Sequence, residues 1–223
     1  MTLSKLLDRP LSTRCGRLHG ILAQGMTKIV FLPGASGAPE FWRPVAATLP
    51  SGWNKTFLSW PGLGHEPHDP AVMGIEDLVS LVLRQLSEPA DLVAQSMGGL
   101  VALKTVLQAP EKVRRLVLAG TSGGLPVQAL GGQDWRPNYR DEYADAAPWI
   151  TQVQEDLSTD LRSIDKRVLL IWGDRDEISP LAVAERLLAI LPHGELSVVA
   201  GGRHDVPRTH PLEVGRLVQQ HLS

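Results

Sequence analysis

What most constrains the fold of this chain is a repeated alternation between short apolar runs and longer segments with helical spacing. The run at residues 27–32 (TKIVFL) is rich in β-branched and apolar side chains and ends at Pro33-Gly34, as buried strands that meet a loop commonly do. By the same signs, the sequence predicts further strands at residues 55–60, 90–95, 113–119, 167–172 and 195–200. Helices are predicted between them at residues 40–49, 75–86 and 98–108, after Ser179-Pro180, and at 211–221. Strands separated by helices pair in parallel through right-handed crossovers, so we expect an α/β fold with a mostly parallel central sheet and helices on both faces.

Two segments depart from this alternation. Residues 125–166 carry Gly131-Gly132 and several aromatic side chains among many charges, without a convincing strand. We expect them to form a small helical lid over a core made of residues 1–124 and 167–223, because a chain of 223 residues suits one sizeable domain. Residues 11–25 are predicted to form a short antiparallel hairpin.

The charge balance argues against two classes of partner. With 22 basic and 24 acidic residues the net charge is −2, and no basic stripe is present that would neutralise a row of phosphates, so nucleic acid is not expected as a partner. The apolar stretches are too short and too interrupted to cross a bilayer, so no membrane partner is expected either. Cys15 is the single cysteine, which excludes an intrachain disulfide and agrees with a reducing compartment. Because the N-terminus lacks the features of a signal peptide, the expected location is cytoplasmic.

Ser96 is the candidate nucleophile. The segment DLVAQSMGGL (91–100) delivers this serine from an apolar strand into a turn from which a helix departs. Such a strand–serine–helix elbow holds the serine in a sparsely populated conformation and needs small residues two positions before and after it, here Ala94 and Gly98. The backbone N–H of Met97 would then face a developing oxyanion at the N-terminus of the helix. The alternative is that Ser96 only caps that helix.

A serine hydroxyl needs a base, and the base needs a third group that fixes its tautomer. His204 follows a predicted strand and a glycine pair in VVAGGRHDVPRTHP (198–211), and it is the histidine with this placement. For the acid, WGDRDEISP (172–180) follows another strand, and Asp174, Asp176 and Glu177 all compete there. Any one of these carboxylates could instead be a solvated loop residue or a charge at a helix N-terminus.

The loop FLPGASG (31–37) follows the first predicted strand and contains two glycines. It is flexible enough to bring a backbone N–H against a carbonyl oxygen of a substrate, and Ala35 is the expected second donor of an oxyanion hole beside Met97. Ser36, next to Ala35, is a candidate substrate contact. An ordinary strand-to-helix connection is the alternative.

From the strand at 27–32 to the closing helix, the chain resembles the α/β-hydrolase-fold superfamily. FLPGASG resembles the family's His-Gly oxyanion loop with Pro33 in place of histidine, and SWPGLGHE (59–66) resembles its Asp-x-x-Gly-x-Gly segment with Ser59 in place of aspartate. AQSMGG (94–99) resembles the elbow motif G-x-S-x-G, with Ala94 in place of the first glycine. The family pattern Gly-x-x-Asp-x-x-x-Pro favours Asp176 as the acid, with Asp174 as the fallback.

This resemblance implies a small esterase or thioesterase that forms an acyl-enzyme on Ser96 with a small-molecule acyl substrate. Such chemistry needs no metal and no organic cofactor. Trp135, Tyr139, Tyr143 and Trp149 of the lid, and Trp42 near the oxyanion loop, are candidates for the pocket wall, although each of them could equally pack a core. Two alternatives stay open: carbon–carbon cleavage or elimination by the same three residues, and a non-catalytic receptor for a small molecule on the same fold. The sequence does not specify an oligomeric state.

Overall fold

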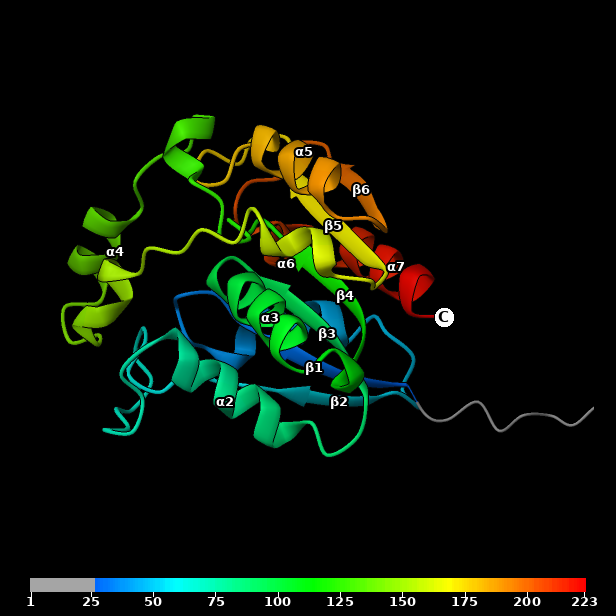
Figure 1. Cartoon of the computed structure of the whole chain (residues 1–223), viewed down its shortest axis with the longest axis horizontal. Coiled ribbons are helices and arrows are strands. Elements are labelled where there is room, and N and C mark those ends of the chain that lie inside the picture. Colours follow the sequence, from blue (N-terminus) through cyan, green and yellow to red (C-terminus); the bar gives the residue numbers. More distant parts are fainter. Residues whose placement is uncertain (1–26) are drawn as a thin grey trace, which may run out of the picture.

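The computed structural model describes residues 27–223, and it contains a six-stranded sheet in which every pair of neighbours is parallel. In chain order the strands are β1 (Lys28–Leu32), β2 (Asn54–Phe57), β3 (Ala90–Gln95), β4 (Val113–Ala119), β5 (Val168–Gly173) and β6 (Gly194–Val199). They lie side by side in the order β2-β1-β3-β4-β5-β6 (Figure 1). The predicted α/β fold with a mostly parallel sheet is therefore confirmed. The predicted hairpin at residues 11–25 and Cys15 lie outside the described residues.

The helices occupy both faces of the sheet. The α-helices are α1 (Arg43–Ala46), α2 (Ile75–Gln85), α3 (Met97–Gln108), α4 (Arg136–Glu142), α5 (Leu181–Ile190), α6 (Val206–Thr209) and α7 (Pro211–Leu222). One buried cluster joins α2, α3 and α5 to one face, and a second cluster joins α1, α6 and α7 to the other face. Along β1, Val30 and Leu32 belong to the first cluster while Ile29 and Phe31 belong to the second. Because both faces of the sheet are covered, the middle parts of its central strands are apolar on both sides.

Two predicted elements are shorter in the structure. The helix expected at residues 40–49 is a 3-10 turn (Pro39–Trp42) followed by the single turn of α1. Pro44 lacks the N–H that would continue an α-helical ladder through this region. The strand expected at residues 55–60 ends at Phe57, and Trp60 turns away to bond the loop after β1: its backbone N–H donates to the carbonyl of Gly37 at 3.0 Å.

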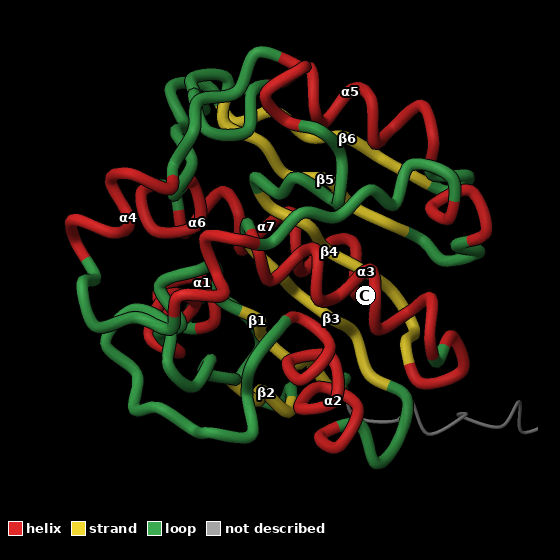
Figure 2. The backbone as a smooth tube through the Cα atoms, turned by 60° about the vertical axis from the view of Figure 1, so that its left-hand side comes forward, coloured by secondary structure: helices red, strands yellow, loops and turns green. Residues whose placement is uncertain are grey.

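The carboxyl ends of all six strands meet at one edge of the sheet, which is where ligands bind in open α/β sheets. The segment 125–166, which we call the insertion, runs between β4 and β5 and contains only helical turns: α4 and the 3-10 turns Val127–Leu130, Pro148–Gln152 and Asp160–Ser163. Figure 1 and Figure 2 both show α4 beyond this carboxyl edge. Within residues 27–223, no helix is long and apolar enough to cross a membrane.

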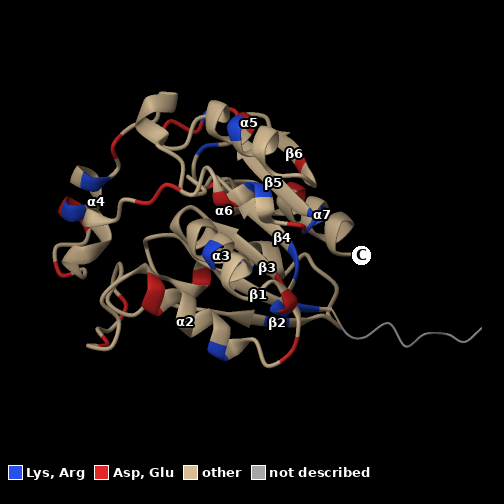
Figure 3. Cartoon of the chain, in the orientation of Figure 1, with Lys and Arg blue, Asp and Glu red and all other residues tan. Residues whose placement is uncertain are grey.

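The opposite edge of the sheet holds the C-terminal helix through charged groups. Asp91, whose side chain is fully buried, pairs with Arg114 at 2.8 Å and with Arg115 at 3.0 Å. The guanidinium group of Arg115 also donates to the carbonyl oxygens of His221 at 3.3 Å and Leu222 at 2.8 Å. Elsewhere on the described chain, basic and acidic residues are interspersed over helices and loops (Figure 3). The buried Asp91 thus ties α7 to β3 and β4.

The side chain of His221 predicts that the stability of the protein depends on pH. Burial lowers the pKa of His221 below the ordinary value of 6.5, and the cations Arg167 and Arg115 lower it further, while Glu195 opposes them. As the pH falls, His221 therefore binds a proton in the unfolded chain at a higher pH than in the folded chain. The contribution of His221 to stability is complete above pH 6.5 and is lost as the pH falls from 6.5 through the folded-state pKa. We expect the free energy of unfolding of the His221→Phe variant to fall less between pH 7 and pH 5 than that of the unaltered protein, measured by urea denaturation. Equal losses in both proteins would contradict this assignment.

Candidate active site

Ser96 lies between β3 and α3 in a strained backbone conformation. Its φ of 51° and ψ of −122° make it the one non-glycine residue with positive φ among residues 27–223. Its N–H donates to the carbonyl of Ala119 at 3.0 Å, and the hydroxyl of Thr121 donates to its carbonyl at 2.6 Å. The Ser96 side chain makes no capping hydrogen bond to α3, so the geometry does not favour the helix-cap interpretation. Strain of this kind is held only where the surrounding structure fixes it, and it is common at functional sites.

Small residues around Ser96 permit this turn. A Cβ atom added at Gly98 would collide with the backbone carbonyl oxygens of Leu32 and Pro33, so the first turn of α3 packs directly on the loop after β1. Ala94, which stands where the elbow motif has glycine, is fully buried between Leu32 of β1 and Leu118 of β4. The extra methyl group is accommodated inside the sheet.

His204 bridges Ser96 and Asp176. Its Nε2 lies 3.0 Å from Ser96 Oγ, and its Nδ1 lies 2.9 Å from Oδ2 and 3.1 Å from Oδ1 of Asp176. The histidine stands in the loop after β6, where Gly201 has a φ of 75° that allows the chain to turn inward. The structure therefore brings together three side chains that the sequence carries at the ends of three different strands.

Of the three competing carboxylates, Asp176 is the one that reaches the histidine. Its side chain is fully buried, and Oδ1 also accepts the N–H groups of Ile178 at 3.0 Å and Ser179 at 2.8 Å. Asp174 is exposed and accepts the N–H of Gly201 at 2.7 Å, while Glu177 is exposed at the rim of the pocket described below. Backbone bonds thus fix one oxygen of Asp176 and leave the other for the imidazole ring.

The two expected oxyanion donors both lie beside Ser96. Met97 is the first residue of α3, so its N–H precedes the hydrogen bonds within that helix and lies at the positive end of the helix dipole. Ala35 and Ser36 are the central residues of a turn that the N–H of Gly37 closes on the carbonyl of Gly34 at 3.1 Å. A Cβ atom at Gly34 would lie 3.1 Å from the Cβ of Ser96, which shows how closely this turn approaches the serine.

A cavity of about 1030 Å³ opens at this site. Ser96, His204, Met97, Ala35 and Ser36 line one part of it, and apolar residues of α3 and the insertion line another, including Leu100, Leu125, Val127, Trp135, Tyr139, Ile150 and Val153. Charged residues at its rim include Glu142, Glu155, Asp156 and Arg208. The volume and the mixed lining suit a small organic molecule with an apolar part.

Two aromatic residues expected at the pocket are placed elsewhere. Trp42 is fully buried on the α1/α7 face of the sheet, where its indole N–H donates to the carbonyl of Leu32 at 2.9 Å, and its neighbour Phe41 reaches the cavity instead. Trp149 packs on the buried cluster under α3, while the adjacent Ile150 lines the cavity. Trp42 therefore fills the core, while Trp149 is partly buried against it.

Three residues that sequence reasoning did not single out support the site. Gln95 donates through its side-chain amide to the carbonyl of His204 at 3.1 Å. Gly120 has a φ of 49°, and a Cβ atom there would lie 3.0 Å from Asp176 Oδ2. The third is Thr121, whose hydroxyl holds the carbonyl of Ser96. The glycine directly after β4 was the available signal in the sequence, because glycine is the usual residue where another group approaches the backbone closely.

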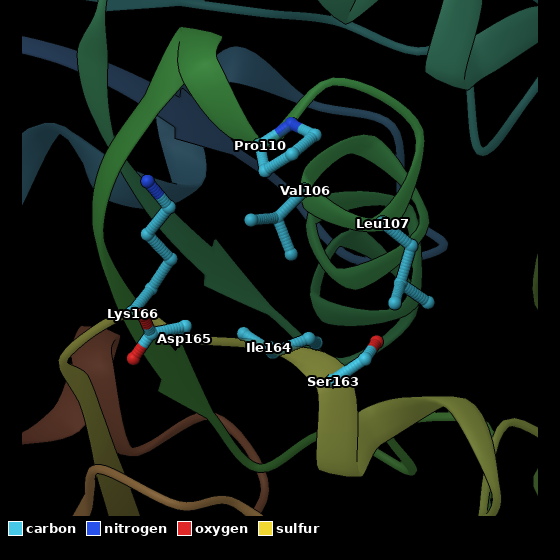
Figure 4. Close-up of a pocket in the computed structure, with 7 residues that line it drawn as sticks. All are labelled: Val106, Leu107, Pro110, Ser163, Ile164, Asp165 and Lys166. Atoms are coloured by element: carbon cyan, nitrogen blue, oxygen red, sulfur yellow. The ribbon is translucent and has the colours of Figure 1, made fainter.

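A smaller cavity of about 360 Å³ lies between the C-terminal end of α3 and residues 163–166 (Figure 4). Its polar lining consists of Ser163, Asp165 and Lys166. Asp165 already accepts a hydrogen bond from His193 at 2.8 Å. This cavity therefore lacks the paired nucleophile and base of the larger one.

The larger site contains the parts needed for nucleophilic attack. An ionised carboxylate can only accept hydrogen bonds, so Asp176 keeps the hydrogen of the imidazole on Nδ1 and leaves Nε2 free to accept the hydroxyl proton of Ser96. The first turn of α3 and the turn at residues 34–37 both lie beside Ser96. Such an arrangement can stabilise an oxyanion formed when the serine attacks a carbonyl.

Comparison with known proteins agrees with this fold. A family model described as "Alpha/beta hydrolase family" matches residues 29–150, which is more than half of the 223 residues. The chain belongs to the alpha/beta hydrolase family. Among solved structures, this alpha/beta hydrolase is similar to a hydrolase from Pseudomonas aeruginosa PA01, with a TM-score of 0.73, 19% identity and coverage of 90% of this chain and 91% of that chain.

Two further structures carry names that specify an activity. A meta-cleavage product hydrolase from Pseudomonas fluorescens IP01 aligns with a TM-score of 0.70 and 18% identity over 87% of this chain and 90% of that chain. A thermophilic esterase from Thermogutta terrifontis aligns with a TM-score of 0.71 and 18% identity over 88% of this chain and 89% of that chain. At this identity the likeness concerns the fold, which both named activities share.

Proposed function

We propose that this alpha/beta hydrolase cleaves a carboxylic ester or thioester of a small molecule through an acyl-enzyme intermediate on Ser96. The observation that carries the proposal is the unbroken hydrogen-bond chain from Ser96 Oγ through His204 to Asp176, with distances of 3.0 Å and 2.9 Å. A serine that only capped a helix would need no such partners. The strained backbone of Ser96 and the adjacent N–H donors support the same proposal.

In the first half of the proposed reaction, His204 Nε2 takes the proton of Ser96 as Oγ bonds to the substrate carbonyl carbon. The negative charge that forms on the carbonyl oxygen is held by the N–H groups of Met97 and Ala35. When this intermediate collapses, the bond to the leaving oxygen or sulfur breaks, and His204 returns its proton to the leaving group. The acyl group then remains on Ser96.

In the second half, water attacks the acyl-enzyme while His204 accepts its proton. The acid departs and the proton returns to Ser96 Oγ. Asp176 stabilises the imidazolium form of His204 in both halves. We further propose that the insertion acts as a lid, with Trp135 and Tyr139 forming part of the wall beside the acyl group and Ser36 contacting the substrate near the oxyanion.

Burst kinetics with p-nitrophenyl esters of increasing acyl length, in parallel with acyl thioesters, test this proposal. We expect turnover of at least one member of the panel and a rapid release of nitrophenol, stoichiometric with enzyme, if deacylation is slow. Folded protein that turns over no member of the panel, and forms no adduct with an active-site serine reagent, would contradict the proposal and favour a receptor. Turnover restricted to carbon–carbon bonds would identify the alternative chemistry.

A further inference from the structure

The side chain of Tyr139 joins three segments that are far apart in the sequence. Its hydroxyl donates to the carbonyl oxygen of Ala35 at 2.9 Å and accepts the N–H of Gly64, also at 2.9 Å. Tyr139 itself belongs to α4 of the insertion, Ala35 to the turn beside Ser96, and Gly64 to the loop after β2. One phenol oxygen therefore links the insertion to the proposed oxyanion turn.

This hydroxyl group is suited to a fixed structural contact. Tyr139 is only 7% exposed, and its ring packs edge-on against Trp135 with centroids 5.4 Å apart. Burial raises the pKa of Tyr139 above its usual value of 10.0. The phenol thus keeps its proton in the range in which a histidine base works, and it remains a donor to Ala35.

The loop after β2 holds the turn from its other side. A Cβ atom at Gly64, whose φ is 57°, would collide with the carbonyl group of Ser36, so the two backbones are in direct contact. The indole N–H of Trp60 donates to the carbonyl of Pro33 at 2.8 Å. The same loop is also bonded to the insertion, because the N–H of Ala147 donates to the carbonyl of Gly62 at 2.7 Å. The loop after β2 therefore contacts the turn at residues 34–37 and is also bonded to the insertion.

We propose that Tyr139 is a positioning residue for the reaction: by holding the carbonyl of Ala35 it fixes the turn at residues 34–37, which carries the Ala35 N–H, and it makes the geometry of the oxyanion hole depend on the insertion. This inference rests on the proposed function, because the oxyanion in question is the one that forms when Ser96 attacks a carbonyl carbon. Tyr139 does not itself touch the reacting atoms. Its effect on the rate passes through the backbone of Ala35.

The Tyr139→Phe variant tests this inference, because it keeps the aromatic ring in the pocket wall and removes only the hydroxyl. We expect kcat to fall by about tenfold or more while KM stays within about twofold, since the oxyanion donor acts in the transition state rather than on the bound ester. The rate at which a fluorophosphonate modifies Ser96 should fall in parallel with kcat. The pH profile of kcat/KM should keep its shape, because the contacts of His204 are unaltered.

Thr105→Val is the matched control for loss of a buried hydroxyl. Thr105 lies fully buried in α3, and its hydroxyl bonds only within that helix, to the carbonyl of Val101 at 2.8 Å. We expect this variant to lose thermal stability without a comparable loss of kcat. Unchanged kcat in Tyr139→Phe, an effect on KM alone, or an equal loss of kcat in Thr105→Val would overturn the positioning role.

A second variant reaches the same turn from the loop after β2. Gly64→Ala would push the carbonyl of Ser36 away without altering the Tyr139 side chain, so it should lower kcat. If Tyr139→Phe does not fold, Gly64→Ala becomes the test of the inference. Unchanged kcat in Gly64→Ala would then overturn it. Failure of the proposed function is distinguishable, because the unaltered protein would then neither turn over esters nor react with the fluorophosphonate.

Discussion

Replacing Ser96 with alanine is expected to lower kcat for ester hydrolysis by about 10⁴–10⁶-fold, the scale on which loss of a catalytic nucleophile is felt in serine hydrolases. Without Oγ no acyl-enzyme can form, and only binding and the N–H donors remain. The fold should persist, since the Ser96 side chain makes no bond to α3 and its backbone bonds to Ala119 and Thr121 do not use the hydroxyl. Steady-state kinetics with the best ester of the panel measure the loss, and circular dichroism checks the fold.

The matched control is Ser87→Ala. Ser87 is exposed in the loop between α2 and β3, at the opposite edge of the sheet, where its hydroxyl accepts a bond from Lys28 at 3.3 Å. We expect its kcat to stay within about twofold of the unaltered value, as for most surface substitutions. Hydrolysis that survives in the Ser96→Ala variant at more than a small fraction of the original rate would show that the serine is not acylated.

The Asp176→Asn variant is expected to lower kcat by about 10⁴-fold with the loop still folded. The two oxygens of Asp176 have separate tasks, because Oδ1 accepts the N–H groups of Ile178 and Ser179 while Oδ2 lies closest to His204 Nδ1. An asparagine can keep its carbonyl oxygen at the first position, which places its NH₂ group against Nδ1. Because an NH₂ group donates, Nδ1 must then accept, and the hydrogen of the imidazole moves to Nε2. A protonated Nε2 can no longer accept the proton of Ser96.

Asp174→Asn separates this effect from a general change of charge in the loop. Asp174 lies two residues earlier, is exposed, and accepts only the N–H of Gly201. Its substitution should change kcat by less than about threefold. Equal losses in the two variants, measured with the same ester and at the same pH, would show that Asp176 has no special relation to the histidine.

The sheet and its helices could be predicted from the sequence because most of the strands contain a short apolar run with a glycine or proline near its end. The placement of Ser96 and His204 at the ends of strands followed from the same pattern. The acid was harder to assign. Asp174, Asp176 and Glu177 occupy one loop, and the structure shows by burial and by the contact with His204 that Asp176 is the carboxylate that turns inward.

The pocket wall could not be predicted to the same extent. Phe41 and Trp42 are adjacent aromatic residues of one 3-10 turn, and only the structure shows that Trp42 enters the core while Phe41 reaches the cavity. The sequence suggested Tyr139 only as an aromatic residue in the wall of the pocket. Its hydroxyl bonds join residues separated by 104 and 75 positions, so no local pattern encodes them.

The measurement that tests the account most directly is peptide mapping by mass spectrometry after treatment with a fluorophosphonate. We predict a single adduct per chain, located on Ser96, whose formation slows greatly in the His204→Ala variant because the imidazole no longer takes the proton from Oγ. An adduct on another residue, or one that forms at Ser96 equally fast without His204, would contradict the proposed mechanism.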